Sequence, residues 1–126
     1  RVPTRIPGHS AVIHLTGVYH LDGTISKPGF ALRVINDLTT ALGLTRVKSV
    51  SHTFPRKPNA RPDSPNGITA VNLLEESHIA LHTYPEEQRV IITISVCRPV
   101  SVEAVERVFA AHSLTVTPDH GAKWMA

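Results

Sequence analysis

The chain has 126 residues, of which 41% are hydrophobic, and a formal net charge of +3. This length predicts one domain, residues 1–126, that can bury a core without disulfides. The basic residues are not clustered, which argues against nucleic-acid binding, and no apolar run reaches the roughly 18 residues of a membrane span. The single cysteine, Cys97, cannot form an internal disulfide. A lone cysteine suits a reducing compartment. Because residues 1–5 also lead into no apolar signal segment, we expect a cytoplasmic protein.

The first half of the chain predicts a strand, a helix and a second strand. Residues 10–18 are rich in β-branched side chains, which favour a strand. Apolar residues recur at helical spacing over residues 28–42, and Gly43 is a fitting C-terminal stop. Residues 44–54 predict a strand. The proline-rich segment 55–66 predicts a surface loop, because proline cannot donate a hydrogen bond inside a sheet.

The second half predicts four further strands and one further helix. The strands are expected at 68–74, 78–83, 89–97 and 114–117, with a turn over 84–88 and a helix that starts near 99–101. Short turns between neighbouring strands favour antiparallel pairing. We therefore expect an α+β fold, a two-layer sandwich with two helices on one face of a mostly antiparallel sheet. The other face must meet solvent or a partner, and the apolar late strands favour a partner.

The hairpin of residues 78–97 brings the cysteine back to a serine. If Tyr84 pairs with Arg89, Cys97 lies opposite Glu76 and beside Ser77, twenty positions earlier in the sequence. A register slip of one residue keeps Cys97 next to Ser77 but exchanges the faces of the strands. In the first register, polar side chains gather on one face of this strand pair: His78, His82, Thr93, Ser95 and Cys97.

A serine beside a strained turn can convert a peptide bond into a cofactor. Ser77 Oγ would attack the Glu76 carbonyl and form an ester, and a base would then remove the Ser77 α-proton. Elimination and hydrolysis would leave a pyruvoyl group, and His82 and Thr69 are suitable types for the proton shuttle and the polarising hydroxyl. A pyruvoyl group condenses with a substrate amine and is an electron sink for decarboxylation. A thiol such as that of Cys97 can return the proton.

Each of these residues also has a simpler interpretation. A Glu-Ser-His tripeptide is most often just a turn, and a cysteine that ends a β-branched strand is most often a packed core residue. His78 and His82 are four residues apart, but they lack a third ligand at a metal-site spacing, so we expect no metal. Glu86 is most simply a turn residue, and the basic residues of the proline-rich loop are most simply solvated.

The combination is more specific than its parts, because three separated positions agree in spacing. Residues 67–86, which read GITAVNLLEESHIALHTYPE, together with Cys97, resemble the bacterial and archaeal S-adenosylmethionine decarboxylases. That family has a Gly-[Val/Ile]-[Ser/Thr] strand, then Glu-Ser-His, then His-Thr-Trp-Pro-Glu, then a cysteine that ends the next strand. The chain departs from this pattern at Tyr84 in place of tryptophan, at Thr93 in place of aspartate and at Arg98 in place of glycine.

The resemblance implies self-cleavage between Glu76 and Ser77, which gives chains 1–76 and 77–126, the second beginning with a pyruvoyl group. It also assigns roles to four other positions: His82 and Thr69 in processing, Cys97 as proton donor and Glu86 in binding the substrate ribose. The implied fold is a two-layer α/β sandwich, and the implied assembly is a homodimer with active sites at the interface.

The substrate stays open at this point. The family implies S-adenosylmethionine, for polyamine (spermidine) synthesis. A pyruvoyl-dependent decarboxylase of ornithine or arginine on the same fold is an alternative, because the departures surround the pocket and spare the cofactor-forming residues. A second alternative is an unprocessed homologue that acts as the regulatory partner of an active subunit.

Overall fold

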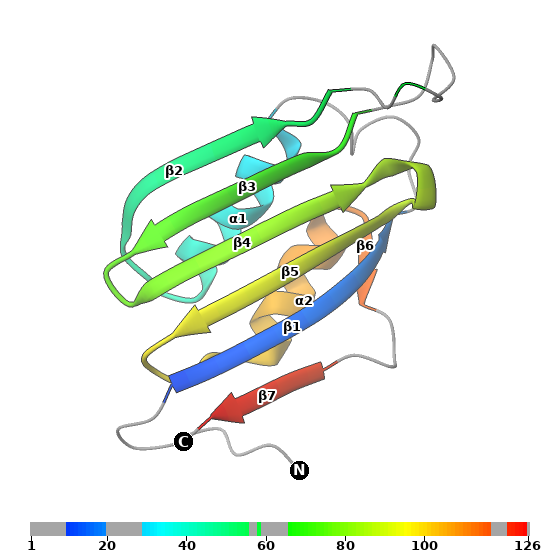
Figure 1. Cartoon of the computed structure of the whole chain (residues 1–126). Coiled ribbons are helices and arrows are strands. Elements are labelled where there is room, and N and C mark those ends of the chain that lie inside the picture. Colours follow the sequence, from blue (N-terminus) through cyan, green and yellow to red (C-terminus); the bar gives the residue numbers. More distant parts are fainter. Residues whose placement is uncertain (1–9, 20–28, 56–57, 59–65, 117–120, 126) are drawn as a thin grey trace.

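The computed structural model describes residues 10–19, 29–55, 58, 66–116 and 121–125. In chain order the elements are β1 Ser10–Tyr19, α1 Phe30–Ala41, β2 Arg46–Thr53, β3 Ile68–Leu74, β4 Ser77–Tyr84, the 3₁₀ helix η2 Pro85–Glu87, β5 Arg89–Val96, α2 Val102–Ala111, β6 Leu114–Val116 and β7 Gly121–Met125 (Figure 1). Among the described residues, no helix is long and apolar enough to cross a membrane.

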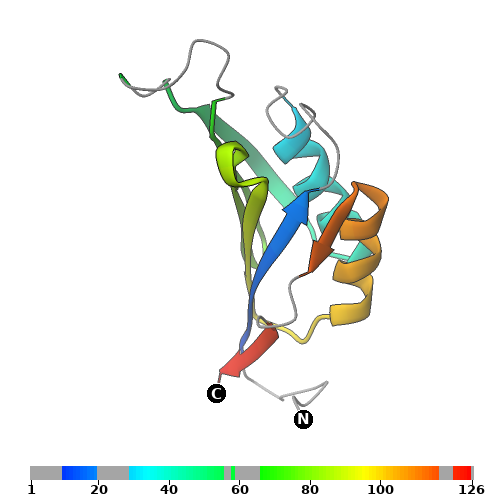
Figure 2. The same cartoon turned by 90° about the vertical axis from the view of Figure 1, so that its right-hand side faces the viewer.

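The strands form one sheet in the order β2-β3-β4-β5-β1-β6, and β7 also pairs with β1. Every pair of neighbouring strands is antiparallel. Both helices lie on the same side of the sheet, as the edge-on view shows (Figure 2). The structure thus confirms the predicted α+β sandwich with two helices on one face, and no helix or strand among the described residues covers the other face of the sheet. We call that surface the open face.

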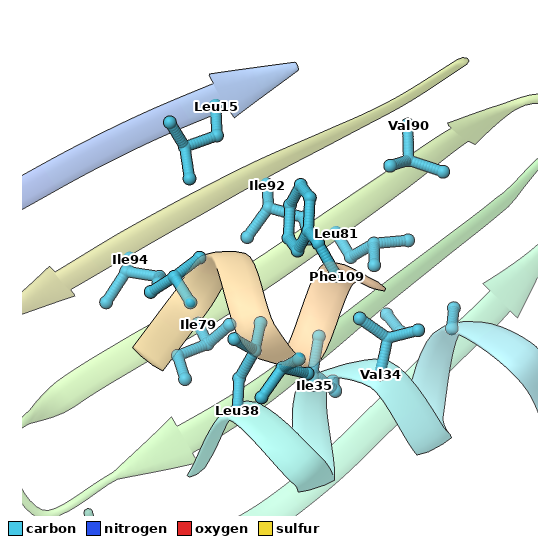
Figure 3. Close-up of a cluster of buried hydrophobic side chains, with 14 of the residues drawn as sticks. Leu15, Val34, Ile35, Leu38, Ile79, Leu81, Val90, Ile92, Ile94 and Phe109 are labelled. Carbon is cyan, nitrogen blue, oxygen red and sulfur yellow. The ribbon is translucent and has the colours of Figure 1, made fainter. Parts of the chain in front are cut away.

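The core lies between the sheet and the two helices (Figure 3). Alternate residues of the central strands point into it, including Ile79 and Leu81 of β4 and Ile92 and Ile94 of β5, and all four are fully buried. Phe109 of α2 is fully buried and lies against these strands, near Ile92 and Leu81. The buried positions on β4 and β5 thereby fix which face each remaining side chain of these strands occupies, because a register shift of one residue would expose the core.

The core contains a buried asparagine whose side chain is fully hydrogen-bonded. Asn72 of β3 is fully buried, and its amide group donates to Asn36 Oδ1 at 2.9 Å and to Thr39 Oγ1 at 3.0 Å. Its carbonyl oxygen accepts from Ser49 Oγ of β2 at 2.6 Å. A buried polar group is tolerated when its hydrogen bonds are made. Asn72 therefore ties α1 to β3, the strand that precedes the Glu-Ser-His sequence.

The structure corrects boundaries of the predicted elements and adds one strand. Helix α1 begins at Phe30 and not at residue 28, because Gly29 adopts a left-handed φ of 90° and forms the N-cap. Strand β5 ends at Val96, so Cys97 follows the strand and does not belong to it. Strand β7 was not predicted, because GAKWM lacks β-branched residues and its pairing with β1 is long-range. Residues 56–57 and 59–65 of the predicted proline-rich loop lie outside the described part of the chain.

Candidate functional site

Strands β4 and β5 pair in the register that the sequence predicted. Tyr84 lies opposite Arg89 and Ser77 lies opposite Val96. One position further on, the backbone N–H of Cys97 donates to the carbonyl oxygen of Glu76 at 3.0 Å. This carbonyl belongs to the Glu76–Ser77 peptide bond. The cysteine therefore meets the predicted cleavage site through its own main chain, and its N–H polarises the carbonyl that a nucleophile would attack.

Ser77 has an unusual backbone conformation. The β3–β4 turn is so tight that only Glu75 and Glu76 separate the two strands, and Ser77 has a φ of 137°. A positive φ outside glycine costs about 1–3 kcal/mol and persists only where the surrounding structure imposes it. Its side chain is exposed, and Ser77 Oγ lies 3.2 Å from His78 Nδ1. The predicted nucleophile is therefore strained, accessible and next to a proton acceptor.

The Glu76 side chain is held by the segment between α1 and β2. Its carboxylate accepts from the Thr45 N–H at 3.0 Å and from Thr45 Oγ1 at 3.3 Å, and Arg98 Nη2 lies 3.9 Å away. The pKa of Glu76 lies below its ordinary value, chiefly because of the Thr45 N–H, with smaller contributions from its own backbone N–H, the Thr45 hydroxyl and Arg98. The carboxylate is thus ionised and fixed at neutral pH.

Thr69 and His82 form a second polar pair, on β3 and β4. They are directly opposed in the sheet, and Thr69 Oγ1 lies 2.7 Å from His82 Nδ1. His82 is five positions beyond Ser77 on the same strand, which corresponds to about 16 Å at the rise of a β-strand. The chain therefore brings together Glu76, Ser77 and Cys97, but it holds the Thr69–His82 pair at the other end of β4.

The open face carries further polar side chains between these two ends. His78 and His82 of β4 lie on it with Thr93 and Ser95 of β5, all half-buried, as the predicted register required. His14 of β1 faces Thr93, and the His14 Nδ1 to Thr93 Oγ1 distance is 3.1 Å. Glu86 lies in η2, and its side chain is outside the described part of the structure.

Comparison with known proteins places the chain in a family. The family model described as S-adenosylmethionine decarboxylase matches residues 15–117. The chain belongs to the S-adenosylmethionine decarboxylase family. An S-adenosylmethionine decarboxylase proenzyme of Archaeoglobus fulgidus is 30% identical over 104 residues, which cover 82% of this chain and 81% of the relative.

Two shorter matches carry the same name. The S-adenosylmethionine decarboxylase proenzyme of Persephonella marina is 40% identical over 55 residues, 44% of this chain and 35% of the relative. That of Methanococcus aeolicus is 37% identical over 54 residues, 43% of this chain and 38% of the relative. The predicted family is thus confirmed, and the word proenzyme in each of these names denotes a precursor.

Two of the residues that differ from the family pattern make contacts with polar groups in the structure. Thr93, which stands in place of the usual aspartate, pairs with His14. Arg98, which stands in place of the usual glycine, lies beside the Glu76 carboxylate and donates through Nη2 to the Gly43 carbonyl. Both departures therefore face the polar groups of the site and are not remote surface changes.

Sequence reasoning missed the contributions of His78 and Thr45. His78 entered only as a member of the polar cluster and a weak metal candidate, although its position next to Ser77 was a usable signal. Thr45 precedes Glu76 by 31 residues and carries no motif. Its contact arises because the turn after α1 meets the β3–β4 turn, where the Glu75 N–H donates to the Thr45 carbonyl at 3.0 Å.

Proposed function

We propose that the chain is an S-adenosylmethionine decarboxylase of polyamine synthesis that makes its own pyruvoyl group by cleaving the Glu76–Ser77 bond. Family membership and the proenzyme names of the relatives support this proposal. The observation that carries it is the hydrogen bond from the Cys97 N–H to the Glu76 carbonyl, one residue from a strained and exposed Ser77. A donor, a nucleophile and a proton acceptor meet at one peptide bond, so the residues present fit the formation of this group.

The first step is attack by Ser77 Oγ on the Glu76 carbonyl carbon. His78 Nδ1, 3.2 Å from the hydroxyl, takes the proton in the tautomer whose hydrogen is on Nε2. The Cys97 N–H stabilises the negative charge that develops on the carbonyl oxygen. As the tetrahedral intermediate collapses, the proton passes from His78 to the Ser77 nitrogen and the C–N bond breaks. An ester between Ser77 Oγ and the Glu76 carbonyl carbon remains, with a free amine on Ser77. This shift releases the backbone strain at Ser77. Each ~1.4 kcal/mol of strain that is released in the transition state would speed the attack about tenfold.

The second step removes the Ser77 α-proton and expels the main-chain carboxylate of Glu76, which becomes the C-terminus of chain 1–76. The residue that remains is a dehydroalanine, and its reaction with water releases ammonia and leaves the pyruvoyl group at the start of chain 77–126. This step needs a base. We assign it to His82, whose Nδ1 is oriented by Thr69 Oγ1 at 2.7 Å.

A second copy of the chain has to supply this base, because His82 lies about 16 Å along β4 from its own Ser77. A two-fold axis across the middle of β4, between two facing sheets, would bring Ser77 of each copy to His82 of the other. The open face also carries apolar side chains suited to such contact, with Val50 and Leu73 exposed to 50% and 45%. We therefore propose a homodimer that pairs through the open face.

For decarboxylation, the pyruvoyl group supplies an electrophilic carbonyl that binds the substrate amine and takes up the electron pair left by carbon dioxide. Cys97 is exposed and its main chain bonds to Glu76, next to the residue that would carry the group. Its thiol would return a proton to the substrate carbon. Glu86 follows β4 in the chain, and we propose that it binds the ribose hydroxyls of the substrate. The substrate is thus a small molecule held at the dimer interface.

Complementation between two inactive variants tests the shared site. The Ser77→Ala chain keeps His82, and the His82→Ala chain keeps Ser77. We expect neither to cleave alone, and we expect the His82→Ala chain to be cleaved when the two are refolded together, as followed by mass. Rapid cleavage of His82→Ala alone would refute the assignment of His82. Absence of cleavage in the mixture, despite mixed dimers, would refute the exchange between copies.

Carbon dioxide release tests the substrate. The cleaved wild-type protein should release it from S-adenosylmethionine and not from ornithine or arginine. The Cys97→Ala variant keeps its backbone N–H, so it should still cleave while its decarboxylation falls by about 10²–10⁴-fold. Release from a basic amino acid alone would contradict the proposed substrate.

A further inference from the structure

The residue on the amino side of the cleavage site is held at two points. At one, the Glu76 carbonyl accepts from the Cys97 N–H at 3.0 Å. At the other, the Glu76 carboxylate accepts from both the N–H and the hydroxyl of Thr45, at 3.0 and 3.3 Å. The Glu76 side chain is only 15% exposed, so its carboxylate is held in place and is not a freely rotating surface charge.

Arg98 joins the two points. It follows Cys97 in the chain, its Nη2 lies 3.9 Å from Glu76 Oε2, and the same nitrogen donates to the Gly43 carbonyl. Gly43, with a positive φ of 66°, follows Leu42, the C-cap of α1, and Thr45 comes two residues later. Arg98 therefore connects the segment that holds the carboxylate to the segment that holds the carbonyl.

We propose that Thr45 and Arg98 form a clamp on the Glu76 carboxylate that aligns the Glu76–Ser77 peptide bond for self-cleavage. This inference rests on the proposed function and makes Thr45 and Arg98 positioning residues, since neither contacts Ser77 in the described structure. Attack by Ser77 Oγ requires the carbonyl to stay aimed at the Cys97 N–H while the strained backbone rearranges. Fixing the side chain of Glu76 limits its rotation about the backbone and keeps that orientation.

The clamp also explains why a glutamate suits the position before the serine. Two Thr45 donors and a guanidinium together match an ionised carboxylate better than any neutral side chain. A glutamine at position 76 would keep an oxygen for the Thr45 N–H but would lose the charge that attracts Arg98. An alanine would lose every contact of the clamp.

The self-cleavage rate of freshly synthesised chain tests whether the clamp speeds the reaction. Cell-free synthesis followed by timed denaturation and intact mass gives the half-time for Glu76→Ala, Glu76→Gln, Arg98→Gln and the double variant Glu76→Gln/Arg98→Gln. We expect Glu76→Ala to slow cleavage by about tenfold or more, because small misplacements of reacting groups cost large factors. Glu76→Gln and Arg98→Gln should each slow it by about two- to fivefold, the smaller effect fitting an arginine that is 45% exposed.

The double variant separates a clamp from a general loss of structure. If Arg98 acts through the Glu76 charge, the double variant should cleave no more slowly than Glu76→Gln alone. Arg107→Gln removes an equally basic, exposed side chain from α2 and should cleave at the wild-type rate. Urea unfolding, with Ser77→Ala added to block cleavage, should show that every glutamine variant is fully folded under the conditions of the cleavage assay.

The outcomes are distinct for the two proposals. Wild-type cleavage with unchanged rates in all Glu76 and Arg98 variants would overturn the clamp and leave the proposed function standing. Independent, multiplicative effects of Glu76→Gln and Arg98→Gln would also overturn it. A wild-type chain that never cleaves would overturn both.

Discussion

Backbone strain at Ser77 can be measured by comparing two variants that cannot cleave. Ser77→Ala keeps a Cβ at the φ of 137°, whereas Ser77→Gly removes it. The strain is worth about 1–3 kcal/mol, and glycine carries an opposing entropic cost of about 0.5–1 kcal/mol. We therefore expect Ser77→Gly to be the more stable by about 1 kcal/mol. With a urea m-value of about 1–3 kcal/mol/M, its unfolding midpoint should be higher by about 0.3–1 M.

A matched control sits on the neighbouring strand. Ser95 lies opposite His78 and is not among the described residues with positive φ. In a Ser77→Ala background, Ser95→Gly should be less stable than Ser95→Ala by about 0.5–1 kcal/mol, the reverse of the order at Ser77. Urea unfolding followed by circular dichroism gives both differences. If alanine were as stable as glycine at position 77, the strain argument would be wrong.

Three further predictions concern packing and charge, each measured by urea unfolding of the uncleavable chain. Gly17→Ala should destabilise by about 1–3 kcal/mol, because the added Cβ would lie 3.0 Å from Phe109 Cε2; an unchanged midpoint would contradict this. Asn72→Leu should cost about 1–3 kcal/mol, because Ser49 Oγ loses its 2.6 Å acceptor; a more stable variant would refute this. The pKa of Glu76 is lowered from 4.5 on folding, so its contribution to stability is present above that value and is lost as the pH falls through the folded pKa. The advantage over Glu76→Gln should therefore shrink between about pH 6 and about pH 3, and a constant difference would count against it.

The hairpin was the most predictable part of this molecule. Two β-branched strands around a short turn allow few registers, and burial of alternate residues such as Ile79 and Ile94 selects one of them. That register alone places Cys97 opposite Glu76. The antiparallel order and the single helix layer followed from short connections and from two amphipathic helices.

The contacts around Glu76 could not be predicted in the same way. Thr45 and Glu76 are separated by 31 residues, and their contact depends on how the turn after α1 packs against the sheet, which no local pattern encodes. Strand β7 was not predicted for a similar reason, because its pairing with β1 joins distant parts of the sequence. The distance between Ser77 and His82 was implicit in the sequence, because five residues of extended strand span about 16 Å, but only the continuous β4 makes that spacing certain.

Formation of the pyruvoyl group is the central claim, and the intact mass of the purified protein under denaturing conditions tests it most directly. We predict two chains that divide between Glu76 and Ser77, the second of which gains the mass of a hydrazine that traps its carbonyl. A single uncleaved mass, with no carbonyl to trap, would contradict the account and favour a regulatory role for the intact chain.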